Sequence, residues 1–153
     1  MSVPIISSKK LSQEQVNLGR IWLAGLLGSA GAVIANLITR AVLFAALPLP
    51  AEFPPLQMGA IAMLTAIGTL LAAVVYALVA RFLSRPVTVF RWIAIVVLIV
   101  SILPNFALMV NPTAIPFPFP GASGLAFGVL IVFHIVAALV SVLTLTGMTR
   151  KNV

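Results

Sequence analysis

The chain has 153 residues, of which 62% are hydrophobic and only 7% are charged, and this composition excludes a water-soluble fold, since soluble domains carry about 25% charged residues. The net charge of +7 does not indicate a nucleic-acid partner, because the nine basic residues flank apolar segments and form no stripe with interleaved aromatic residues. The chain contains no cysteine, which excludes disulfides, thiolate metal sites and iron–sulfur clusters.

Residues 1–20 are polar and are predicted to form a cytosolic tail. Ser12 and Gln15 have the spacing of a capping box, so a short interfacial helix is expected to start there. A signal peptide is the alternative interpretation of this end of the chain. An uncleaved first span is favoured over it, because the apolar segment from Ile21 is longer than the ~7–15 residues of a signal-peptide core and no convincing cleavage site is present.

The first two membrane spans are predicted at about 21–47 and 56–80. Each is long enough to cross a bilayer, which takes about 20 residues of helix. Pro48 is expected to end the first span, because proline lacks the backbone N–H that a helix needs. The first span contains Arg40, and the loop that follows it contains Glu52.

The third and fourth spans are predicted at about 87–110 and 124–146. Pro86 suits the first turn of a helix, where a missing N–H costs nothing. Pro104 lies inside the third span, which is expected to continue past it with a kink. The segment 111–121 is rich in Pro and Phe and is predicted to be a stiff, extended connector at the membrane surface, with Phe117 and Phe119 at the interface.

The basic residues predict the topology. With four spans, eight of the nine fall on one side of the membrane, and by the positive-inside rule this side is the cytosol. These residues are Lys9, Lys10, Arg20, Arg81, Arg85, Arg91, Arg150 and Lys151. The sequence therefore predicts an all-α polytopic four-helix bundle, with one membrane domain at 21–147, a C-terminal tail at 148–153 and both termini cytosolic.

The partners expected from this arrangement are lipids. Arg81, Arg85 and Arg91 form the turn between the second and third spans and should attract anionic lipids of the inner leaflet. Trp22 and Trp92 are expected to anchor the spans at the interface, and Tyr76 is given the same role.

Small residues predict how the helices pack, since close backbone approach holds membrane helices together. In the first span they follow one face and include Gly25, Gly28, Ser29, Ala32 and Asn36. In the second span a similar stripe consists of Gly59, Ala62, Ala66, Thr69, Ala73 and Ala77. The two stripes are expected to face each other in a solid bundle, without a pore through one copy, and they are compatible with a homo-oligomer.

Four polar residues in the spans are the candidate site: Asn36, Arg40, Ser101 and His134. Arg40 is predicted near the outer interface, either snorkelling with Glu52 as its partner or forming an anion or substrate site with Asn36 one turn below. His134 is predicted near the bilayer midplane at the depth of Ser101, either as a hydrogen-bonded structural histidine or as a functional group.

Several kinds of chemistry are not indicated. No Asp or Glu lies in a predicted span, which argues against proton-coupled transport through an intramembrane carboxylate. The sequence shows no phosphate-binding glycine loop, no paired carboxylates and no metal-ligand spacing, and it predicts no cofactor, metal or catalytic residue.

The pairs Arg85-Pro86 and Phe90-Arg91, the segment from Ser101 to Pro104, and His134 in the last span form a recognisable pattern. Together with a small-residue first span containing Asn36, the pattern resembles a family of uncharacterised bacterial four-helix membrane proteins, over about residues 20–146. The resemblance implies a four-helix fold, a bacterial inner (plasma) membrane location and deliberate placement of its polar residues, but no activity. The Pro- and Phe-rich connector is not part of it.

Two hypotheses of function follow. The first is a structural or accessory membrane protein. The alternative is a small transporter or ligand-binding membrane protein with its site near Asn36, Arg40, Ser101 and His134. An enzyme is the third reading and is not favoured, because Ser101 and His134 lack an orienting acidic partner.

Overall fold

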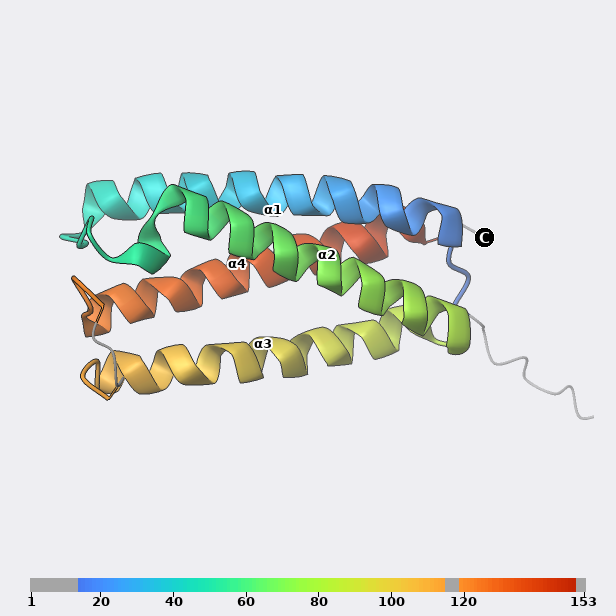
Figure 1. Ribbon diagram of the computed structural model, residues 1–153. Coiled ribbons are helices and arrows are strands. Elements are labelled where there is room, and N and C mark those ends of the chain that lie inside the picture. Colours follow the sequence, from blue (N-terminus) through green and yellow to red (C-terminus); the bar gives the residue numbers. More distant parts are fainter. Residues whose placement is uncertain (1–13, 115–118, 151–153) are drawn as a thin grey trace, which may run out of the picture.

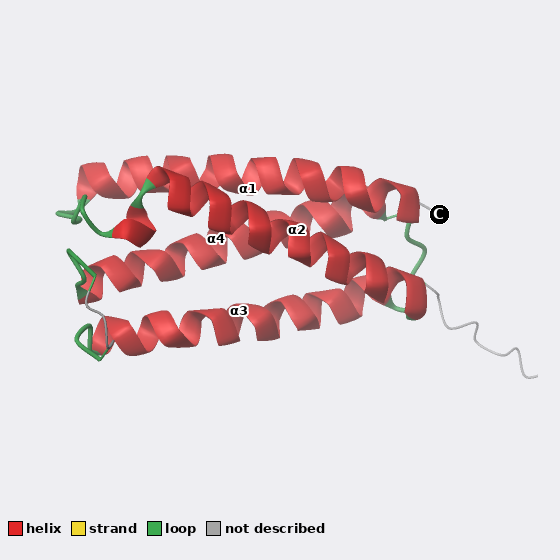
Figure 2. Ribbon diagram, in the orientation of Figure 1, coloured by secondary structure: helices red, strands yellow, loops and turns green. Residues whose placement is uncertain are grey.

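The computed structural model describes residues 14–114 and 119–150 of the chain. Within these ranges the fold consists of four long helices, without a strand element, and one short 3-10 helix (Figures 1 and 2). The elements are α1 (Leu18–Ala46), η1 (Pro54–Leu56), α2 (Met58–Phe82), α3 (Pro86–Val110) and α4 (Gly124–Thr149). The predictions that concerned Lys9, Lys10, Ser12, Phe117 and Lys151 lie outside the described residues.

All four helices are long and apolar enough to cross a membrane. The chain is thus a multi-pass membrane protein, and the predicted all-α architecture is confirmed. Every predicted helix boundary lies within three residues of the observed one.

The helices form an antiparallel bundle in which α1 packs against both α2 and α4 (Figure 1). Helix α3 packs mainly on α4 and meets α2 chiefly near the turn that joins them. Its fully buried residues, Pro86, Val87 and Phe90, all lie in its first turns. The start of α1, the α2–α3 turn and the end of α4 lie together, and we call this the terminal end. The opposite end, with the α1–α2 and α3–α4 connectors, is the loop end.

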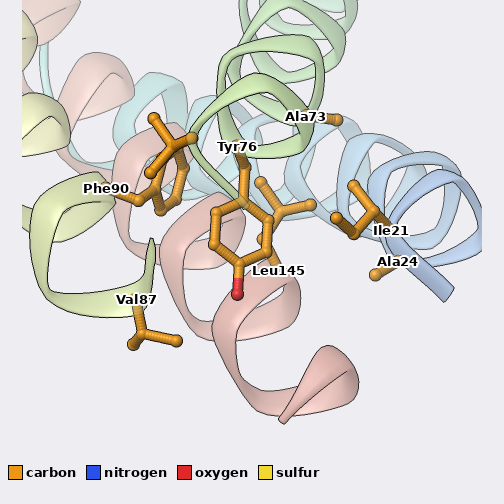
Figure 3. Close-up of a cluster of buried hydrophobic side chains, with 8 residues drawn as sticks. Ile21, Ala24, Ala73, Tyr76, Val87, Phe90 and Leu145 are labelled. Atoms are coloured by element: carbon orange, nitrogen blue, oxygen red, sulfur yellow. The ribbon is translucent and has the colours of Figure 1, made fainter. Parts of the chain in front are cut away.

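Buried aromatic packing closes the terminal end (Figure 3). The Tyr76 ring lies 4.7 Å from the Phe90 ring, and the Tyr76 hydroxyl hydrogen-bonds to Thr149 Oγ1 at 3.0 Å. Tyr76 is 0% exposed, so its predicted role as an interfacial anchor is wrong. The reason is that Thr149 supplies inside the bundle the polar partner that a tyrosine otherwise finds at the interface. Trp22 and Trp92, at 58% and 65% exposed, fit the lipid-facing role.

The α1–α2 connector closes the loop end. Phe53, from the segment predicted as a plain loop, is fully buried, and so is Leu56 in η1. The Phe53 ring stands edge-on to the ring of Phe127 in α4 at 5.3 Å and to that of Phe119 at 6.2 Å. Phe119, predicted to lie at the interface, therefore packs partly onto the connector.

The small residues of α1 pack against two helices, α2 and α4, rather than against α2 alone. A Cβ added at Gly25 would lie 2.6 Å from Ala73 Cβ, which confirms the predicted contact between the α1 and α2 stripes. A Cβ at Gly28 would instead meet Thr144 of α4 at 3.2 Å. Gly59 has no described atom within 4 Å of such a Cβ, so it does not belong to the packed stripe. The expectation that the stripes simply face each other holds only for part of α1.

The helix starts also differ from prediction. Asn17 caps α1 by accepting a hydrogen bond from Gly19 N at 3.1 Å, so Gln15 lies before the helix rather than in its first turn. Pro86 occupies the first turn of α3 as predicted. Arg85, the N-cap residue of α3, offers no side-chain acceptor for the free N–H groups of the helix.

Candidate functional site

Asn36 joins three helices inside the bundle. Its Nδ2 donates to Thr65 Oγ1 of α2 at 2.9 Å and to the backbone oxygen of Phe133 in α4 at 3.3 Å. The nitrogen must face Phe133, because a carbonyl oxygen only accepts hydrogen bonds. The side chain is 1% exposed, and its Oδ1 has no hydrogen-bond partner within the described part of the chain. Asn36 is thus an interhelical link with one unused acceptor.

Arg40 lies one turn further along α1, and its side chain contacts residues at the loop end. Its Nε donates to the backbone oxygen of Leu56 at 2.7 Å, and its guanidinium lies 4.1 Å from the centre of the Phe44 ring. The expected partner Glu52 instead places its carboxylate beside Gly121, 3.1 Å from where a Cβ would stand there. Arg40 therefore fastens the connector to α1, and its guanidinium is not directed at Asn36.

His134 is half-buried and turned back onto its own helix. Its Nδ1 lies 2.7 Å from the Leu130 carbonyl oxygen. Since that oxygen only accepts, Nδ1 is the donor of this bond. His134 follows directly after Phe133, which bonds to Asn36, so the two candidate residues lie at neighbouring levels of the bundle.

Ser101 of α3 lies opposite this region of α4. The antiparallel register is fixed by Met109 against Gly124 at one end and by the cluster that contains Phe90 and Leu145 at the other. Counting inward from these pairs places Ser101 at the level of His134, as the sequence predicted. The Ser101 hydroxyl, however, donates to the Leu98 carbonyl in its own helix at 2.8 Å.

Ser101 lies one turn before Pro104, through which α3 continues as expected. Pro104 has no N–H to donate to the carbonyl four residues earlier, which is that of Val100. The two side-chain hydrogen bonds nearby involve other carbonyls: the Asn105 amide donates to the Ser101 carbonyl at 3.2 Å, and the Ser101 hydroxyl donates to the Leu98 carbonyl. Both bonds lie within α3, so the hydroxyl of Ser101 is used inside its own helix.

Two open pockets of about 450 Å³ lie at opposite ends of the bundle. The first is apolar, at the loop end, and is lined by Leu43, Leu47, Met109, Gly124, Leu125, Gly128, Val129 and Val132. The second is at the terminal end and is lined by Arg20, Leu23, Gly147, Met148 and Arg150. None of the four candidate residues lines either pocket. Within residues 14–114 and 119–150, no group of three His, Cys, Asp or Glu side chains is placed to hold a metal.

Glu14 makes a polar contact with the start of α3 that the sequence did not predict. Its carboxylate accepts hydrogen bonds from the backbone N–H groups of Val87 and Thr88, at 2.7 and 3.2 Å, and from the Thr88 hydroxyl at 2.6 Å. Partial burial raises the pKa of Glu14, but these bonds and the charge of Arg150 together outweigh it, so the pKa lies below its ordinary 4.5. The available signal was Arg85, an N-cap residue that cannot cap α3 itself.

The chain belongs to a family of unknown function, DUF6069, whose family model matches residues 16–151. This confirms the resemblance to an uncharacterised family. Among curated proteins and among solved structures, nothing matches the chain.

Proposed function

We propose that this DUF6069 member is a structural or accessory protein of the bacterial plasma membrane. The observation that carries the proposal is the way in which the polar side chains within the helices are used. The amide of Asn36 links three helices, and Ser101 and His134 bond to carbonyls of their own helices. A transport route would need such groups to face a common water-filled space.

The proposed orientation has both termini in the cytosol. Five arginines of the described chain lie at the terminal end, namely Arg20, Arg81, Arg85, Arg91 and Arg150. The loop end holds Arg40 and Glu52. Basic residues are retained on the cytosolic side of a membrane protein, which supports this orientation. The bacterial plasma membrane is proposed on the resemblance described above.

The same surface is proposed to attract anionic lipids. Arg81, Arg85 and Arg91 are all exposed at the α2–α3 turn. Each basic residue near an anionic membrane surface contributes about 1 kcal/mol of attraction. These arginines would hold lipid diffusely at the cytosolic surface.

One observation favours the alternative of a small transporter or ligand-binding protein. Asn36 Oδ1 is buried without a hydrogen-bond partner among the described residues. An unpaired buried acceptor is costly and would suit a bound water or a ligand with a donor group. The candidate site would then extend from Asn36 toward Ser101 and His134, with Arg40 at its loop-end mouth.

Water access distinguishes the two proposals, and the absence of cysteine allows single-cysteine variants. We would treat membrane vesicles of both orientations with a charged, water-soluble maleimide, using Ser101→Cys and His134→Cys. Ser84→Cys, in the exposed α2–α3 turn, is the reactive control.

For a structural protein, the cysteines at positions 101 and 134 stay unlabelled from both sides until the protein is denatured. Rapid labelling of both cysteines in vesicles of one orientation, with no labelling in vesicles of the opposite orientation, would reject the structural proposal. It would support a route through the bundle.

A further inference from the structure

A pocket of about 450 Å³ opens between the first turn of α1 and the last turn of α4. Arg20 and Leu23 line it from α1, and Gly147, Met148 and Arg150 line it from α4. Its lining thus combines two guanidinium groups with apolar side chains and one bare stretch of backbone at the glycine.

Backbone bonding brings the two arginines together. The Asn17 N–H donates to the Thr149 carbonyl at 2.9 Å, and Val16 pairs with Arg150 in an isolated antiparallel bridge. These contacts hold the residues just before α1 against the end of α4. The fold therefore holds the backbones that carry Arg20 and Arg150 close together, and both residues line the pocket.

No carboxylate among the described residues lines the pocket. Arg150 lies close enough to Glu14 to lower its pKa, but both Glu14 oxygens are engaged by Val87 and Thr88. Two like charges that share a pocket without a lining counter-ion attract an anion.

The depth of the pocket points to a lipid rather than a soluble anion. Arg20 lies in the first turn of a membrane-spanning helix, and Trp22 beside it is 58% exposed, as an interfacial anchor should be. Leu23 and Met148 are also exposed and would contact the upper part of an acyl chain. A Cβ at Gly147 would meet no described atom within 4 Å, so the glycine leaves room for a bound molecule.

We propose that this pocket binds the phosphodiester head group of an anionic phospholipid, with Arg20 and Arg150 on the phosphate and Leu23 and Met148 along the glycerol and first methylenes. Guanidinium groups donate paired, charge-assisted hydrogen bonds to phosphate oxygens. Basic pockets between membrane helices are a known setting for anionic head groups. A zwitterionic lipid gains less, because its own cation offsets the phosphate charge.

The test measures binding of phosphatidylglycerol to the delipidated full chain in neutral detergent, by titration followed with native mass spectrometry. The double variant Arg20→Gln/Arg150→Gln should bind about 150-fold more weakly, because it loses charge-assisted hydrogen bonds to the phosphate. Arg81→Gln/Arg85→Gln removes the same charge from side chains that do not line this pocket and attract lipid only through their charge, so it should lose no more than about 30-fold. Phosphatidylcholine and inorganic phosphate are the comparison probes, and neither should displace phosphatidylglycerol.

A third variant protects the test against misfolding. Gly147→Leu keeps both arginines and fills open space, so it should weaken phosphatidylglycerol binding while the helix content measured by circular dichroism stays unchanged. The proposal is overturned if both double variants lose affinity equally, or if Gly147→Leu binds normally. It is also overturned if inorganic phosphate competes as well as the lipid does, or if phosphatidylcholine binds as tightly.

Discussion

Glu14 caps the first turn of α3 across 74 residues of sequence, by accepting hydrogen bonds from both the amide and the hydroxyl of Thr88 at 3.2 and 2.6 Å. The Val87 amide also donates to it, at 2.7 Å. A carboxylate at a helix N-terminus satisfies free N–H groups and interacts favourably with the helix dipole. Residues 14–17, directly before α1, are therefore part of the folded bundle, and Glu14 holds its least buried helix.

Replacing Glu14 should destabilise the protein. Glu14→Ala removes the only side-chain cap that residues 14–114 and 119–150 give to α3, and a lost cap of this kind costs about 1–2 kcal/mol. The measurement is the thermal unfolding temperature in detergent. Glu52→Ala, at the loop end, is the matched control and should change stability by no more than about 0.5 kcal/mol. Equal unfolding temperatures for Glu14→Ala and the wild type would refute the capping role.

The same contact should depend on pH. The folded-state pKa of Glu14 lies below its ordinary 4.5, so its contribution to stability is complete above that value. The contribution is lost as the pH falls through the lowered pKa, because protonation then becomes possible in the folded protein too. The difference in unfolding temperature between the wild type and Glu14→Gln should be constant from neutral pH to about pH 5 and shrink at lower pH. A difference that grows on acidification contradicts the assignment.

The bond between Asn36 and Thr65 should be measurable as a coupling between α1 and α2. A double-mutant cycle with Asn36→Ala and Thr65→Val isolates it, since the nitrogen–oxygen distance is 2.9 Å and the pair is buried. Interhelical hydrogen bonds in membrane proteins contribute about 0.6 kcal/mol on average and up to about 1.7 kcal/mol. The control is a cycle with Ser101→Ala in place of Thr65→Val. It should show no coupling to Asn36, because the Ser101 hydroxyl bonds within its own helix. A coupling of zero would mean that Asn36 is held by packing alone.

Two glycines with similar neighbours in the sequence, Gly25 and Gly68, should differ in how their replacement by alanine changes the stability of the protein. Gly25→Ala places a Cβ 2.6 Å from Ala73 Cβ, which forces α1 and α2 apart and should cost about 1–3 kcal/mol. Gly68→Ala meets no described atom within 4 Å and should be neutral or stabilising by up to about 1 kcal/mol. Gly28→Leu should also lower stability, but through Thr144 of α4. Unfolding temperatures in one detergent rank the three variants, and a tolerated Gly25→Ala would remove the close contact.

The number, type and ends of the helices followed from the sequence, because span length and prolines such as Pro86 act locally. Neighbour relations did not follow, since helices that are apolar on every side carry little signal for which face is buried. Gly28 therefore met α4 rather than α2, and Tyr76 proved to be an interior residue.

The candidate site shows the same limit. The matching levels of Ser101 and His134 along the bundle were predictable from residue counts. Their partners were not, because a serine or histidine in a membrane helix can bond either a neighbouring helix or its own carbonyls. Only Asn36 reached across, while Ser101 and His134 bonded to the preceding turn.

The orientation in the membrane is the prediction on which the cytosolic assignments depend. Ser84 and Ala51 are both exposed, in the α2–α3 turn and in the α1–α2 connector at the opposite end of the bundle. With the arginine-rich terminal end in the cytosol, Ser84→Cys should react with an impermeant maleimide only in inverted vesicles, and Ala51→Cys only in intact cells or spheroplasts. The reverse pattern would place Arg20 and Arg150 in the outer leaflet, where the pocket could still bind an anionic lipid. Labelling of each position from both sides would indicate mixed insertion, which the charge difference between the two ends of the bundle argues against.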